Sequence, residues 1–130
     1  MNDPNKQDYI NYRIKNAKDA FASAKLLADN SHWNAAINRL YYSCFYIVSA
    51  LLYKNNIIAK KHSGLKHQFT QHFIKTGLID KNIAKVYLRL SDWRQKGDYD
   101  DFEDFDQGKT LPLFEPVENF LNVILTLIEK

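Results

Sequence analysis

Arg94 is a charged residue on a stripe that the sequence predicts to be buried. It follows Leu90 by four positions, and this helical spacing turns its side chain toward the interior of the molecule. A buried guanidinium needs an anionic partner, because an unpaired buried charge is costly. One interpretation is a salt bridge to a nearby acid, namely Asp98, Asp100 or Asp101. The other is a phosphate-binding group at the mouth of a cleft.

The histidines add less chemistry. His62, His67 and His72 are spaced by five residues, so on a helix they point in directions about 140° apart and make a poor metal site. His62 follows Lys60 and Lys61 in a basic loop, where it either contacts a phosphate or simply lies on the surface. The chain has no phosphate-cradling glycine loop, CxxC pair or HExxH motif, and we predict neither a metal nor a cofactor.

The charges are segregated along the chain, although the net charge is only +3. No Asp or Glu occurs from Ser31 to Ile79, a stretch that contains six lysines and arginines. Six acids then fall within residues 98–106. The two regions either pair internally, remain as two solvated clusters, or leave a basic face for an anionic partner such as a nucleotide or RNA.

The elements that position these residues are predicted to form an all-α fold, a five-helix up-and-down bundle in one domain spanning residues 1–130. Its centre is the helix over residues 33–53, which contains fourteen uncharged residues between Arg39 and Lys54. This run is short of the ~20 residues needed to cross a bilayer, so the helix must be covered by protein on several sides. Cys44 lies on its apolar stripe and is expected to be a small buried hydrophobe.

An alanine-rich helix from about Lys6 to Asp29 is predicted to precede the central helix. The connection between them is short, so the two should form an antiparallel pair, with Ser31 as the N-cap of the second. The first eight residues are polar and do not resemble a signal peptide. We therefore expect a cytoplasmic location and no membrane association.

A short third helix is predicted over residues 65–76, with Ser63 as its N-cap and His72 among its inward side chains. Gly77 should end it in a left-handed conformation.

Asp80 should cap a fourth helix, and Gly97 should terminate it. A long acidic loop then lies between the fourth and fifth helices. The fifth helix is predicted to carry Pro116 in its first turn.

Three motifs occur in order along the chain: Arg-Leu-Tyr-Tyr-Ser-Cys-Phe at 39–45, Lys-His-Ser-Gly-Leu at 61–65, and Arg-Gln-Lys-Gly-Asp-Tyr-Asp-Asp-Phe at 94–102. Together they resemble the HEPN domain family, and more closely its small stand-alone members that are encoded beside a minimal nucleotidyltransferase. The resemblance extends from the first helix to the last. It implies a helical bundle that forms a homodimer, with the Arg94 segments of two subunits facing one cleft.

Many members of that family are metal-independent ribonucleases, and some are toxins held inactive by the nucleotidyltransferase partner. Their signature is an arginine followed, after four to six residues, by a histidine. After Arg94 the corresponding positions are Tyr99, Asp100 and Asp101. A tyrosine, with a reference pKa near ~10, is a poor base at neutral pH, and Asp98 would repel the phosphate.

The sequence therefore predicts a homodimeric module that binds nucleotide, RNA or a nucleotidyltransferase partner, in a toxin–antitoxin or defence system. The alternative is a ribonuclease toxin that uses Arg94 and Tyr99, and we leave open whether the chain is an enzyme. By analogy with the family, Tyr99 would also be an acceptor for nucleotidyl transfer. The predicted binding residues are Arg39, Lys61, His62, Arg94, Asp98 and Tyr99.

Overall fold

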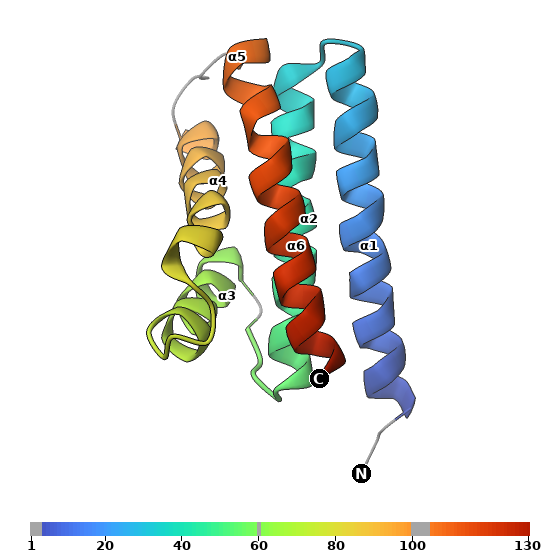
Figure 1. Ribbon diagram of the computed structural model, residues 1–130, viewed down its shortest axis with the longest axis vertical. Helices are drawn as coiled ribbons and strands as arrows, with labels where there is room; N and C mark the ends of the chain where they lie inside the picture. Colours follow the sequence, from blue (N-terminus) through green and yellow to red (C-terminus); the bar gives the residue numbers. More distant parts are fainter. Residues whose placement is uncertain (1–3, 60, 100–104) are drawn as a thin grey trace.

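The structure is a computed structural model that describes residues 4–59, 61–99 and 105–130. The described residues contain helices and no strand, which confirms the predicted all-α fold. The principal helices are α1 (Pro4–Asp29), α2 (Trp33–Lys54), α3 (His62–Phe69), α4 (Lys81–Tyr99) and α6 (Phe114–Glu129). In Figure 1, α2 and α6 lie in the middle of the bundle, with α1 on one side and α3 and α4 on the other.

Helix α2 is the central element, as its composition predicts. It packs against α1, α3, α4 and α6, and Leu40, Cys44 and Val48 on its stripe are fully buried. Burial raises the pKa of the Cys44 thiol, so this cysteine remains protonated and behaves as a small hydrophobe. The helix can be apolar on nearly every side because other helices cover it on several sides.

Small residues bring α1 against α2. Ala17, Ala20, Ala24 and Ala28 are all buried, and their spacing lines one face of α1. The prediction that Ser31 caps α2 is wrong. Ser31 takes a left-handed conformation (φ 61°) at the end of α1, and the N-cap position of α2 falls on the next residue, His32.

Helix α3 differs in detail from the prediction. It begins at His62 rather than after Ser63, because the carbonyl of Lys61 accepts the N–H of Leu65 and takes the capping position. A π-helical turn, Thr70–Ile74, follows it and inserts one extra residue into the helical period. This change of phase leaves His72 exposed rather than inward, whereas Phe73 is buried.

The turn that leads into α4 agrees with the prediction. Gly77 has a φ of 78°, the left-handed conformation expected at the end of the preceding helix. The Asp80 side chain accepts the N–H of Asn82 at 2.7 Å and so caps α4.

The end of α4 does not agree with the prediction. The helix continues through Gly97 to Tyr99, so the prediction that Gly97 terminates it is wrong; a glycine inside a helix costs only about 1 kcal/mol.

The predicted acidic loop between α4 and α6 falls largely on residues 100–104, which lie outside the described residues, so it stays a prediction. At its far end Phe105 packs against Trp93, with ring centroids 5.3 Å apart, and its N–H donates to the Asn34 side chain. Two short turns follow, α5 (Gln107–Thr110) and η2 (Leu111–Leu113). Pro116 is the third residue of α6, in its first turn as predicted.

Two segments are long and apolar enough to cross a membrane, judged by length and composition alone. The first is Trp33–Lys54, and 61% of its most apolar 18-residue window is buried inside the bundle. Its apolarity is therefore explained by its central position. The second is Gln107–Glu129, where 28% of the window is buried. This is weak support for a membrane span.

Candidate functional site

Arg94 lies over two consecutive tyrosines of α2. Its guanidinium carbon is 5.5 Å from the ring centroid of Tyr41 and 6.0 Å from that of Tyr42. The side chain is half-buried, whereas the helical spacing predicts a buried position. The ring quadrupoles attract the cation and favour its position beside α2. The predicted ion-pair partners Asp98, Asp100 and Asp101 have side chains outside the described part, so the salt bridge stays a prediction.

His62 lies against the same tyrosines, although it comes from the start of α3. Its Nδ1 is 2.6 Å from the Tyr41 hydroxyl, and its ring stacks on Phe45 with centroids 4.2 Å apart. It also meets the Tyr42 ring edge-on at 5.7 Å. When the proton is on Nε2, the Tyr41 hydroxyl donates to Nδ1, and Nε2–H remains a hydrogen-bond donor. The structure thus brings His62 and Arg94 to one aromatic surface.

Arg39 supplies a second guanidinium at this surface. Its Cζ lies 4.9 Å from the Tyr42 centroid, on the same ring that Arg94 approaches. Lys61, next to His62, is exposed and provides the N-cap position of α3. We call the group Arg39, Tyr41, Tyr42, His62 and Arg94 the cation–aromatic site. Of the other predicted site residues, Asp98 and Tyr99 are in the last turn of α4, with side chains outside the described part.

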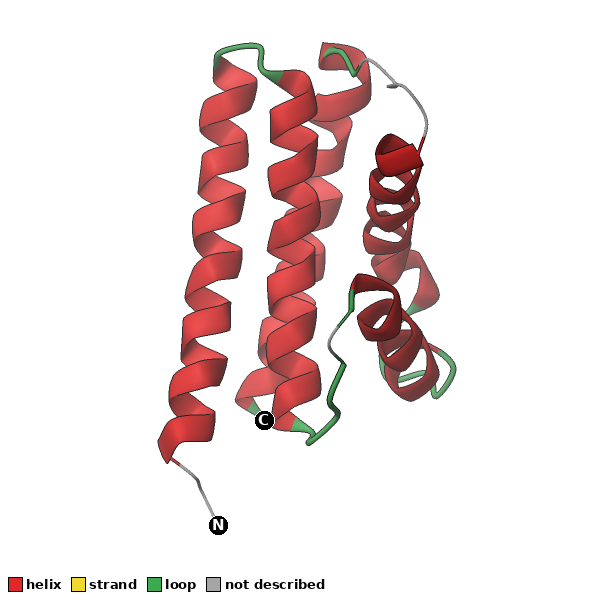
Figure 2. Cartoon of the chain, turned by 180° about the vertical axis from the view of Figure 1, so that it is seen from behind, coloured by secondary structure: helices red, strands yellow, loops and turns green. Residues whose placement is uncertain are grey.

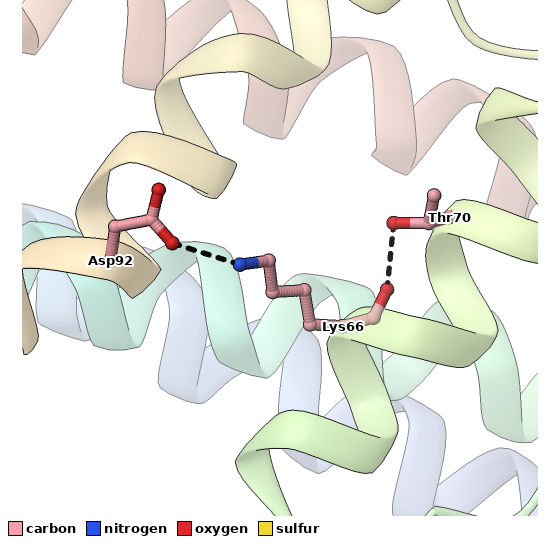
Figure 3. Close-up of polar contacts among 3 residues, drawn as sticks. All are labelled: Lys66, Thr70 and Asp92. Atoms are coloured by element: carbon pink, nitrogen blue, oxygen red, sulfur yellow. Dashed lines mark hydrogen bonds and ion pairs between the residues drawn. The ribbon is translucent and has the colours of Figure 1, made fainter. Parts of the chain in front are cut away.

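Two lysines of the acid-free stretch, Lys54 and Lys66, are engaged within the molecule. Lys66 donates to Asp92 at 3.0 Å and thereby links α3 to α4, as Figure 3 shows. Both side chains of this pair are partly exposed, so it contributes little stability by itself. Lys54 donates to the carbonyls of Leu127 and Ile128 at the end of α6. The potential for anion binding therefore rests on the cation–aromatic site more than on total positive charge.

The chemistry available at the site follows from its groups. Two guanidiniums and an imidazole are groups that can donate hydrogen bonds to phosphate oxygens. Within the part of the chain that the structure describes, no cluster of three or more His, Cys, Asp or Glu side chains could hold a metal ion. Tyr87 stacks beneath Tyr41 at 6.5 Å, and burial raises the pKa of its hydroxyl, so it cannot act as a base.

Sequence reasoning missed the tyrosines as site residues. Tyr41 falls on the apolar stripe of the central helix and Tyr42 on its opposite side, and an aromatic residue of an apolar helix usually serves packing. Both chemical partners, His62 and Arg94, reach them through long-range contacts. An available signal was the cation at position 39, three residues before Tyr42, which puts the two on one helical face.

The fold and the site together define a class of protein: an all-α bundle whose central helix carries cations stacked on tyrosines. The HEPN domain family model matches residues 10–127, so the chain belongs to the HEPN family.

The chain is also similar to individual relatives. It is 37% identical to a "UPF0332 protein" of Thermotoga maritima, over 95% of this chain and 94% of that protein. It is 36% and 30% identical to two proteins of Methanocaldococcus jannaschii, "Putative toxin MJ0142" and "Putative toxin MJ0605". These matches cover 67% and 72% of this chain, and 59% and 69% of the two relatives.

Proposed function

We propose that this chain is a HEPN module that binds the phosphate groups of a nucleotide or RNA at the cation–aromatic site. The observation that carries the proposal is the convergence of His62 and Arg94 on Tyr41, from elements far apart in the sequence. An arginine positioned by aromatic rings keeps N–H donors that can bind a phosphate. Less conformational entropy is lost when such a pre-oriented group binds phosphate.

The biological setting belongs to the same proposal. The module works as a homodimer, in a toxin–antitoxin or defence system, with a nucleotidyltransferase as its partner protein. The names of the two Methanocaldococcus relatives support a toxin-type role. Apolar side chains of α6 that remain half-exposed, including Leu121 and Leu125, support association with a second copy. Sedimentation at tens of micromolar tests the dimer, and a monomer throughout would exclude it.

We expect the purified protein to bind a mononucleotide and a single-stranded RNA at low salt, and the affinity for RNA to fall as salt increases. Each phosphate contact on a single strand contributes about −0.7 to the slope of log K against log salt. Fluorescence anisotropy over a salt series measures the slope. A flat salt response, or no binding of either ligand at low salt, would contradict the proposal.

A second candidate function is a metal-independent ribonuclease, and one contact favours it. The chain has no histidine after Arg94 at the family spacing, but His62 reaches the same tyrosine from α3. Cleavage through the 2′-hydroxyl requires a base that takes its proton, a cation that stabilises the phosphorane, and an acid that protonates the leaving 5′-oxygen. Arg94 has the chemistry of the cation. His62 has the chemistry of the base in its other tautomer, in which Nδ1–H donates to the Tyr41 hydroxyl oxygen and Nε2 takes the proton.

An assay of RNA integrity in the presence of EDTA separates the two functions. For the binding module, we expect the RNA to remain intact, because the chain has no histidine at the signature position. The ribonuclease would instead cut RNA, and cutting would be lost in both His62→Ala and Arg94→Gln. His67→Ala is the matched control, because His67 is exposed on the same helix. Cleavage with that pattern would replace the binding proposal with the enzymatic one.

A further inference from the structure

A row of two arginines and four tyrosines extends from the cation–aromatic site along the α1–α2 pair. The row consists of Arg39, Tyr42, Tyr46, Arg13, Tyr9 and Tyr53. The α1–α2 pair has one side that no other described helix covers, as Figure 2 shows. The members of the row are half-buried, except Tyr53, which is 37% exposed.

The contacts within the row are continuous. The Tyr42 and Tyr46 rings have centroids 5.8 Å apart. The Arg13 guanidinium then lies between two rings, with Cζ 5.4 Å from the Tyr46 centroid and 5.2 Å from the Tyr9 centroid. Tyr9 in turn contacts Tyr53 at 4.4 Å. Because Tyr42 also meets His62 and Arg94, the row begins inside the site.

The charge of the row is unbalanced. Among the described residues, neither Arg13 nor Arg39 forms an ion pair with a carboxylate; Arg13 donates to the Tyr9 hydroxyl, and Arg39 to the Asn38 side chain. The α2 part of the row lies in the stretch that contains no Asp or Glu. Asp8 is one residue from Tyr9, so the Tyr9 end is the less favourable one for an anion.

We propose that this row binds a single-stranded nucleic acid that leads away from the cation–aromatic site. Guanidiniums contact the phosphates of such a strand, and tyrosine rings stack on its unpaired bases. In a duplex the bases are stacked on one another and cannot stack on tyrosine rings. A single strand exposes its base faces, so it is the form that this row of rings and cations can bind. The proposal rests on the proposed function for the start of the strand, and on the row for its continuation.

The length of the row predicts how many nucleotides it can bind. Arg39 and Tyr53 are fourteen residues apart on α2, a distance of about 21 Å along the helix. At ~3.4 Å per stacked nucleotide this accommodates about six nucleotides. Affinity should therefore increase with RNA length up to about six nucleotides and level off beyond it. A site confined to the Arg94 region would show no such increase beyond a dinucleotide.

The test compares Arg13→Gln with Arg89→Gln, using a mononucleotide, a dinucleotide and a single-stranded RNA of twelve nucleotides as probes. Arg89 is a matched control, because its Cζ also stacks on an aromatic ring, Trp93, at 5.5 Å, outside the row. We expect Arg13→Gln to weaken binding of the long RNA about tenfold, and to reduce its salt slope by about 0.7. Mononucleotide binding should be unchanged in Arg13→Gln, and all binding unchanged in Arg89→Gln.

The outcomes separate the row from the site. The proposal that the row binds RNA would be overturned if Arg13→Gln and Arg89→Gln changed the affinity for the long RNA equally. It would also be overturned if affinity did not increase beyond a dinucleotide. Dissociation of the dimer by Arg13→Gln, with RNA binding intact, would overturn it in favour of a contact between copies. If binding of the long RNA depends on Arg94 but not on Arg13, the proposal for the row is wrong and the proposal for the cation–aromatic site is supported. If binding of the long RNA depends on Arg13 but not on Arg94, the proposal for the cation–aromatic site is wrong and the proposal for the row is supported. Circular dichroism verifies that each variant is folded.

Discussion

Replacing Arg94 with glutamine is expected to weaken nucleotide and RNA binding by about ten- to a hundredfold. Hydrogen bonds to a charged group contribute about 1.5–3 kcal/mol, and each ~1.4 kcal/mol corresponds to a factor of ten in the dissociation constant. Glutamine keeps a polar side chain on α4 but removes the charge that Tyr41 and Tyr42 orient. Isothermal titration with a mononucleotide measures the change without any contribution from the proposed row.

The control for this prediction is again Arg89→Gln. Both arginines belong to α4 and stack on aromatic rings, but Arg89 is exposed and stacks on Trp93 instead of the α2 tyrosines. Loss of one positive charge from the molecule is therefore common to the two variants, and only the location differs. If both variants bind the mononucleotide equally well, Arg94 is not the phosphate-binding group. The thermal midpoint of each should be recorded, since loss of the cation–π contact costs about 0.5–1 kcal/mol.

The largest effect on stability is expected for Phe120→Ala. Phe120 is fully buried and joins three helices, because its ring lies 5.9 Å from that of Phe69 and 5.7 Å from that of Tyr87. Removing a buried ring loses its transfer free energy and leaves a cavity, at a cost of about 3–5 kcal/mol. This is a large fraction of the ~5–15 kcal/mol by which a domain is ordinarily stable.

Denaturant unfolding at one fixed protein concentration measures this effect, because association of copies would make stability depend on concentration. The matched control is Phe114→Ala, the same change on the same helix. Phe114 is half-buried and contacts Phe21 edge-on at 5.8 Å, so its loss should cost clearly less. Equal losses of free energy in the two variants would show that the Phe69–Tyr87–Phe120 cluster is not the centre of the core.

The Phe69–Tyr87–Phe120 cluster also packs against the cation–aromatic site, through the contact of Tyr87 with Tyr41. Tyr87 stacks on Phe120 on one side and approaches Tyr41 on the other, with ring centroids 5.7 Å and 6.5 Å away. Tyr41 is itself buried, so its hydroxyl is held in position for His62 by packing. The orientation of the site therefore depends on the core of the bundle as well as on its own hydrogen bond.

Helical periodicity was sufficient to predict the principal helices, but it predicted a buried position for Arg94, whose side chain is half-buried. Details of helix ends were less predictable. Serine and glycine are compatible with several positions around a helix terminus, so Ser31, Ser63 and Gly97 were each assigned a terminal role that the structure gives to another residue. The π-helical turn has no evident signal in the sequence, and His72, which lies within it, is exposed.

By itself, the sequence determined that this protein is a bundle around an uncharged helix, and that Arg94 turns inward on α4. Both follow from local rules, because the hydrophobic period and the absence of charge act within one helix. Only the tertiary structure decided that His62 meets Tyr41, and that Arg13 of α1 lies between Tyr9 and Tyr46. The Tyr41–His62 and Arg13–Tyr46 contacts join residues that are far apart in the sequence, and their geometry depends on how whole helices pack.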